Sequence, residues 1–94
     1  MDPEDAAELQ SLIDSGIAWR LEGAVGRACM AAITSGDCIL GPVWHRDYWG
    51  NYVPSRYEVK DGTKGSLSYA NKMLDAEYTE EDFDNGDVFQ DEDI

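Results

Sequence analysis

The amino-acid sequence predicts a mainly α fold, with two to three helices, a long ordered aromatic loop, and an acidic C-terminal tail that is disordered or folds on a partner. Three observations support this prediction. Apolar residues recur at helical spacing in the first half and again near residue 70, aromatic residues gather without a period in the middle, and acids accumulate at the end. A chain of 94 residues has room for one domain at most, which we place at residues 1–78, with the tail at 79–94.

The first helix is expected from about residue 3 to residue 14. Asp2 is a suitable N-cap, and Pro3 is tolerated in the first helical position. Leu9, Leu12 and Ile13 then follow at i, i+3 and i+4, which is the spacing of one helix face.

A second helix is expected to begin near residue 16 or 17 and to run to about Thr34, unless the first two helices form one bent rod. Gly36 is the expected left-handed cap at its end. Gly23 and Gly26 lie inside this stretch, and each costs up to about 1 kcal/mol of helix propensity. The usual compensation is the close approach of another element. A homodimer through this glycine face is therefore one hypothesis.

The third helix is expected after Ser66, a plausible cap, and should end near residue 77 or 78. Leu67, Ala70, Met73 and Leu74 give it an apolar face at helical spacing. Between the second and third helices no period is visible. A brief strand could form at residues 57–59, but it would have nothing to pair with, so we expect an ordered loop that packs over the helices.

The net charge is −13, from 20 acids and 7 bases, and the acids gather at the two ends of the chain. The segment from Ser15 to Leu74 holds all seven bases and only five acids. Because affinity for DNA comes largely from Lys and Arg, direct nucleic-acid binding by the whole chain is disfavoured and a basic partner is favoured. No run approaches the roughly 18 apolar residues of a membrane span, so no membrane association is expected.

Catalytic and metal-binding chemistry is weakly represented, so we expect neither an enzyme nor a cofactor. His45 is the one histidine, and Cys29 and Cys38 are not at the spacing of a zinc knuckle. His45 with its neighbours could do acid–base work, but a histidine bonded to backbone or water is the simpler interpretation. The acids near Gly86 do not match the EF-hand pattern, and we expect no metal site.

Arg20 and Arg27 lie one heptad apart and therefore share a helix face. A solvated or salt-bridged face is the simpler interpretation. A contact patch for an acidic partner or a phosphate is the alternative.

The aromatic stretch is the main candidate interaction site. Tyr, Trp and Arg are the residue types that dominate binding hot spots. If the stretch is exposed it is an interface, whereas if it is buried it is a lid on a small core. The candidate binding residues are Trp44, His45, Arg46, Tyr48, Trp49, Tyr52 and Arg56.

Residues 15–27, 40–59 and 62–66 together resemble a family of small uncharacterised proteins encoded by actinobacteriophages. The resemblance covers roughly residues 9–70 and is most distinctive in the loop from His45 to Arg56. It implies a phage origin, expression in the host cytoplasm and a dispensable or host-directed role. It carries no activity and no functional residue, and the acidic extension from Asp75 onward departs from the family pattern.

Three functions follow as hypotheses. The first is a non-catalytic module that binds and modulates a host or phage protein through the aromatic loop. The second is an acidic mimic of nucleic acid that occupies the basic groove of a DNA-binding protein. The third is a small enzyme built around His45. We favour the first, because the middle of the chain has a positive balance and no catalytic constellation is evident.

Overall fold

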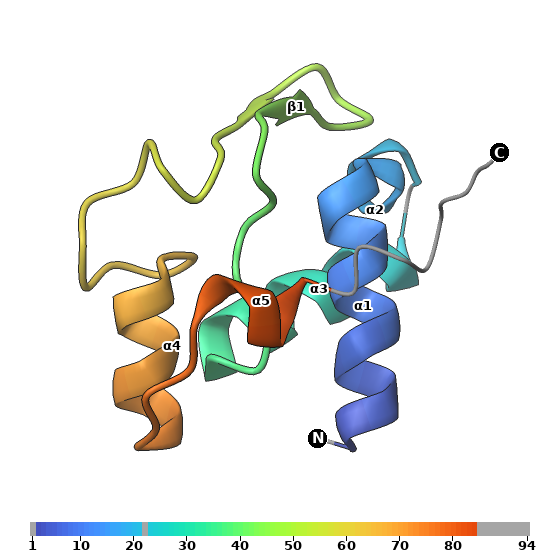
Figure 1. Ribbon diagram of the computed structural model, residues 1–94. Helices are drawn as coiled ribbons and strands as arrows, with labels where there is room; N and C mark the ends of the chain where they lie inside the picture. The colour runs from blue at the N-terminus through green and yellow to red at the C-terminus, as the bar shows by residue number, and fades with distance from the viewer. Residues whose placement is uncertain (1, 22, 85–94) are drawn as a thin grey trace, which may run out of the picture.

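The computed structural model describes residues 2–21 and 23–84, which hold five helices and one two-stranded antiparallel sheet (Figure 1). Helix α3 contacts α1, α2 and α4, while the sheet lies at one end of the molecule and contacts α2. The described residues are thus helix-rich, as expected. The elements in chain order are α1 (Pro3–Ser15), α2 (Ile17–Arg20), α3 (Ala24–Ser35), β1 (His45–Arg46), β2 (Tyr52–Val53), α4 (Leu67–Leu74) and α5 (Glu80–Phe83).

The first helix forms as predicted and ends at a left-handed glycine. Asp2 occupies the N-cap position and Pro3 the first turn of α1. Gly16 follows the helix with φ 85°, and its N–H donates to the Ile13 carbonyl at 3.1 Å. A Cβ atom at Gly16 would lie 2.5 Å from the imidazole of His45. A glycine here therefore lets the sheet pack against the corner between α1 and α2.

The prediction of one long second helix is wrong, because the chain forms α2 and α3 with a break between them. Gly23 in the break has φ 96° and ψ −131°, a conformation open essentially to glycine alone. A Cβ atom at Gly23 would meet nothing within 4 Å, and one at Gly26 would lie in ordinary contact 3.6 Å from the Ala18 carbonyl. Gly23 therefore does not mark the close approach of another element, whereas Gly26 lies against the backbone of α2 with room for a side-chain atom. Homodimerisation through this face stays a prediction.

The apolar interior consists of two clusters that the extended segment after α3 connects. Gln10 fixes this segment from α1, because its side-chain amide donates to the Ile39 carbonyl at 2.8 Å and accepts from the Ile39 N–H at 2.9 Å. Both polar groups of this buried side chain are thereby satisfied. The first cluster comprises Ile13, Ala18, Trp19, Cys29, Ala32, Ile33, Cys38 and Leu40, and the second comprises Ile39, Ala70 and Phe83.

The expectation of an aromatic loop without strands is also wrong, and the brief strand considered at residues 57–59 does not form. Strands β1 and β2 pair antiparallel, with His45 opposite Val53 and Arg46 opposite Tyr52. Side chains alternate between the two faces of a strand. Arg46 and Tyr52 lie exposed, whereas His45 and Val53 are partly buried, and Val53 packs against the first cluster. Each strand has only two residues, which is too short to show an alternating pattern in the sequence.

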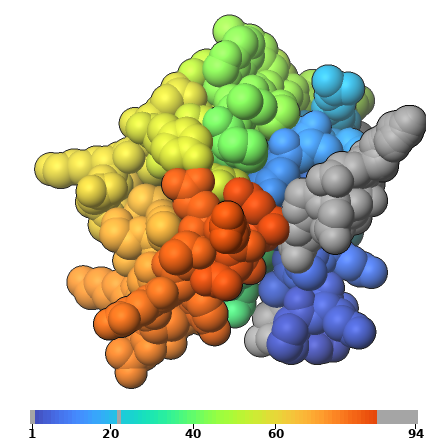
Figure 2. Space-filling model, viewed as in Figure 1, coloured from blue at the N-terminus to red at the C-terminus, as the bar shows by residue number. Residues whose placement is uncertain are grey.

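The acidic tail begins later than residue 79, because residues 79–84 belong to the folded body. Helix α4 starts at the predicted cap Ser66, whose hydroxyl accepts from the Tyr69 N–H at 3.1 Å. Helix α5 then places Phe83 in the second cluster, where it is 7 % exposed. Figure 2 shows the residues of α5, in red-orange, between the α4 side of the molecule and the blue surface of α1. The predicted disorder of residues 85–94 concerns a segment outside the described residues.

Candidate functional site

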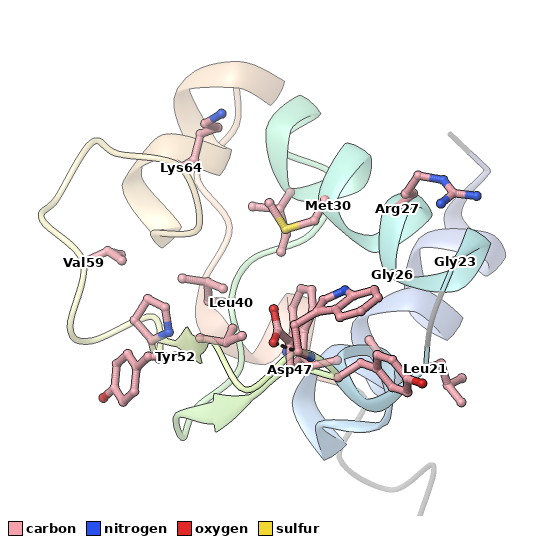
Figure 3. Close-up of a pocket in the computed structure, with 17 residues that line it drawn as sticks. Leu21, Gly23, Gly26, Arg27, Met30, Leu40, Asp47, Tyr52, Val59 and Lys64 are labelled. Atoms are coloured by element: carbon pink, nitrogen blue, oxygen red, sulfur yellow. Dashed lines mark hydrogen bonds between the residues drawn. The ribbon is translucent and has the colours of Figure 1, made fainter.

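An open groove of about 1010 Å³ lies between the hairpin and the helices α2 and α3 (Figure 3). In Figure 3, Arg27 and Met30 lie along one wall, on α3, and Asp47 and Tyr52 lie on the opposite side, on the hairpin. Leu40 contributes to the apolar lining. The volume is at the upper end of the range typical of ligand-binding pockets, which is roughly 300–1,000 Å³.

The hairpin turn that forms one side of the groove is ordered by the carboxylate of Asp47. Its Oδ1 atom accepts from the N–H groups of Trp49 at 2.9 Å and Asn51 at 2.8 Å. The backbone of Asp47 also closes the turn, since its N–H donates to the Asn51 carbonyl at 2.9 Å and its carbonyl accepts from the Gly50 N–H at 3.0 Å. The turn therefore has a fixed shape before any partner binds.

This turn displays two large aromatic side chains at the groove. Trp49 is 69 % exposed and Tyr48 is 54 % exposed. The two rings meet edge to face, with centroids 4.9 Å apart. Both residues line the groove. Such exposed aromatic side chains on an ordered turn lose little conformational entropy when they bind, which is the property of hot-spot residues.

The other side chains of the hairpin divide between its outer and inner faces. Trp44 stacks on Tyr52 with ring centroids 5.5 Å apart, and the guanidinium of Arg46 lies 5.9 Å from each of these rings. Trp44 and Arg46 do not line the groove, whereas Tyr52 belongs to both surfaces. The predicted binding residues thus form a groove set and an outer platform rather than one patch.

His45 faces inward and packs against Gly16. Its Nε2 atom is buried and has no hydrogen-bond partner among the described residues. His45 does not line the groove. Its place is a packing position in the corner between α1, α2 and the hairpin.

Arg56 is buried, at 4 % exposed, so a partner does not reach it in this structure. Its Nε donates to the Leu40 carbonyl at 2.8 Å. Its two terminal nitrogens form a bidentate pair with Asp84, at 3.0 and 2.8 Å, and contact Asp14 at 3.2 Å and Glu80 at 3.1 Å. The inclusion of Arg56 in the binding set is therefore corrected. This residue joins α1, the segment before α4, and α5.

Asp14 and Asp84, which both contact the Arg56 guanidinium, have pKa values shifted in opposite directions. Burial raises the pKa of Asp14 to about 7, and repulsion by Asp84 acts in the same direction. For Asp84 the bonds and charge of Arg56 outweigh the effect of burial and lower the pKa. Asp84 is thus the carboxylate that pairs most strongly with Arg56, and Asp14 is the one that accepts a proton near neutral pH.

Groups that could carry out chemistry are sparse among residues 2–21 and 23–84. Cys29 and Cys38 are buried free thiols, and burial raises their pKa values to about 11 and about 12, so both stay protonated at neutral pH. Within the same ranges, no group of three or more His, Cys, Asp or Glu side chains could hold a metal ion. The described helices include none that is long and apolar enough to cross a membrane.

Sequence reasoning found the hairpin side of the groove but missed the helical side. Tyr48, Trp49 and Tyr52 were predicted binding residues and line the groove. Leu21 and Met30, on the helical side, were not among the predicted binding residues, yet both are exposed and line the groove. The break at Gly23 could not be placed from the sequence. If α2 and α3 are treated as one helix, the residues that face the groove cannot be identified correctly.

No family model, curated protein or solved structure matches the chain.

Proposed function

We propose that the protein is a non-catalytic binding module that holds an apolar segment of a partner protein in the groove between the hairpin and α2–α3. The observation that supports this most strongly is the exposure of Tyr48 and Trp49 on a turn that Asp47 orders in advance. Large aromatic side chains at an exposed, shaped surface are typical of protein interfaces. Fully burying one such side chain contributes about 1.5–3 kcal/mol.

A protein segment fits the groove better than a small molecule does. The groove is open along its length, and Leu21 and Met30, on its helical side, are 46 % and 49 % exposed. A drug-sized ligand usually has most of its surface buried by a concave site. A helix or an extended segment instead lays its apolar face into an open groove and leaves the other face in water.

The origin of the partner is proposed from the resemblance of residues 9–70 and not from the groove. A host or phage protein in the host cytoplasm is the partner that we propose on that basis. The alternative of an acidic nucleic-acid mimic gains no support from the described residues. Asp14, Glu80 and Asp84 converge on Arg56, which neutralises part of their charge within the molecule.

Affinity capture from host lysate tests the proposal when it compares variants that differ only at the groove. Trp49→Ala should reduce the amount of the captured partner by about tenfold or more. Its thermal stability should change little, because Trp49 is 69 % exposed. Tyr57→Ala is the matched control, since Tyr57 is 63 % exposed and lies outside the groove.

Retention of the partner by the Tyr57 variant and its loss from the Trp49 variant would support the groove as the interface. Equal retention by both variants, or the absence of any partner in every sample, would contradict the proposed function.

A further inference from the structure

We propose that the groove is suited to an acidic segment, in which carboxylates flank bulky apolar side chains. This inference rests on the proposed function and specifies the chemistry of the partner. Three observations support it: two cations in the groove lining that have no carboxylate partner among the described residues, the hydrogen bonding of the carboxylate that also lies there, and a buried indole N–H without an acceptor among the same residues.

The first observation concerns Arg27 and Lys64, which both line the groove. In Figure 3 they lie on the same side, with Met30 between them. All three ion pairs that the described residues form involve Arg56, so neither Arg27 nor Lys64 has a carboxylate partner there. The chain has 20 acids and only 7 bases. In so acidic a chain, two unpaired cations beside an apolar surface favour a partner that brings the acids.

The second observation concerns Asp47, the carboxylate in the groove lining. Its oxygens already accept from the N–H groups of Trp49 and Asn51, and the Asn51 side-chain amide lies 3.4 Å away. These donors stabilise the carboxylate charge inside the turn. The Asp47 carboxylate is therefore engaged within the hairpin turn, so a carboxylate of a bound segment is favoured beside Arg27 and Lys64 and not beside Asp47.

The third observation is the indole of Trp19, another lining residue. Trp19 is 6 % exposed, and its Nε1 atom has no hydrogen-bond partner among residues 2–21 and 23–84. A buried donor without an acceptor costs about 1–3 kcal/mol. Because the Nε1 atom is buried in the free protein, a carboxylate or carbonyl oxygen of a bound segment would supply the acceptor only when binding turns the indole toward the groove. A carboxylate oxygen can accept a hydrogen bond from the Trp19 indole and can pair with the Arg27 and Lys64 cations.

The net charge of −13 opposes the approach of an acidic segment at long range. At physiological ionic strength the Debye length is about 8 Å, so distant charges are largely screened and direct contacts decide the affinity. The acidic ends of the chain therefore slow the encounter with an acidic segment. They do not remove the preference that the groove cations create once contact is made.

The test uses two short fluorescein-labelled peptides that share leucine and phenylalanine anchors, one with flanking aspartates and one with flanking lysines. Fluorescence anisotropy gives the affinity of each for the full chain. We expect the aspartate peptide to bind about tenfold more tightly. The double variant Arg27→Glu with Lys64→Glu should reverse that preference. Lys60→Glu with Lys72→Glu makes the same charge change outside the groove and should leave it intact.

Trp19→Phe removes the indole donor and keeps an aromatic ring, so it should weaken the aspartate peptide a few-fold more than the lysine peptide. If both peptides bind equally, or if the control pair of lysines matters as much as Arg27 and Lys64, the acidic preference is overturned while the groove remains a binding site. If neither peptide binds, this inference is overturned; retention of a captured partner by the Trp49→Ala variant would in addition overturn the proposed function.

Discussion

Arg56 and Trp49 show how two residues of one aromatic-rich stretch take opposite roles. Arg56 is buried because its guanidinium finds three carboxylates and the Leu40 carbonyl, which together satisfy its donors. Trp49 is exposed because its backbone N–H binds Asp47 in the turn while its ring faces the groove. Residue type alone did not separate these roles, since Arg and Trp are common both in interfaces and in small cores.

Replacing Arg56 with methionine should destabilise the protein by about 3–5 kcal/mol, because Asp14, Glu80 and Asp84 would then lie together without a cation. Denaturant unfolding measures the difference. Arg20→Met is the matched control, because Arg20 is exposed on α2, and it should change the free energy of unfolding by no more than about 0.5 kcal/mol. Equal effects of the two substitutions would contradict a structural role for Arg56.

Asp14 should make stability depend on pH. The pKa of Asp14 is about 7 in the folded protein, compared with an ordinary value of 3.8, so the folded state binds more protons between these values. The free energy of unfolding should therefore fall as pH rises from about 4 to about 7, by about 1–2 kcal/mol after solvent screening at this partly exposed group. The contribution of Asp84 to the pH dependence of stability has the opposite sign, because the pKa of Asp84 is lowered. This contribution is lost only in more acidic solution.

Unfolding measurements at pH 5 and pH 8 test this expectation. Asp14→Asn removes the titrating group and should flatten the pH dependence in that window. An unchanged slope in this variant would show that Asp14 ionises freely in the folded state.

At the scale of elements, the hairpin and the break between α2 and α3 together create the groove. The hairpin supplies one wall because the Asp47 turn aims Tyr48 and Trp49 at the helices. The break at Gly23 turns α3 away from α2, so that Leu21 and Met30 line the other wall. Neither feature is a helix or a long strand. The hairpin turn depends on a few hydrogen bonds to Asp47, and the break depends on one glycine, Gly23.

Asp47→Ala should destabilise the folded protein by about 1–2 kcal/mol, because two backbone N–H groups lose their charged acceptor. It should also weaken partner binding, since the turn would no longer hold Trp49 in place. Asn51→Ala loses only the 3.4 Å side-chain contact and serves as the control. Denaturant unfolding and affinity capture measure the two effects. Normal binding by the Asp47 variant would show that the order of the turn is unimportant.

The sequence predicted the elements that local signals define and missed those that depend on distant partners. The first helix, the Gly36 cap and the Ser66 cap all appear as expected, because caps and helical periodicity act within a few residues. The hairpin strands of two residues each are too short for periodicity. The docking of α5 depends on Arg56, which lies 24 residues from Glu80 in the chain. No local pattern reports such a contact.

The candidate site was predicted in part for the same reason. Aromatic composition identified Tyr48, Trp49 and Tyr52, but composition does not distinguish them from Arg56. The helical wall of the groove could be predicted only if the position of the Gly23 break were known. That Lys64 has no carboxylate partner among the described residues follows only from the three-dimensional fold. For Arg27, a contact patch for an acidic partner or a phosphate was only the alternative to the simpler interpretation, a solvated or salt-bridged helix face.

At the scale of the whole molecule, the Arg56 cluster and the groove that we propose as the binding site lie in different parts of the structure. Arg56 and the second apolar cluster hold α5 and α4 on one side of α3. The hairpin and α2 lie at another part of the surface and present the groove (Figures 1 and 3). We therefore expect substitutions at Arg56 to change stability and substitutions at Trp49 to change binding.

Site-specific photo-crosslinking tests the central claim most directly. A photoreactive side chain at Met30, which lines the groove, is compared with one at Lys72, which is exposed on α4 outside it. Both proteins are irradiated in host lysate, and crosslinked products are identified by mass spectrometry. The account predicts that one partner crosslinks to position 30 and not to position 72. Crosslinking of that partner at position 72 alone, or equally at both positions, would contradict the groove as the binding site.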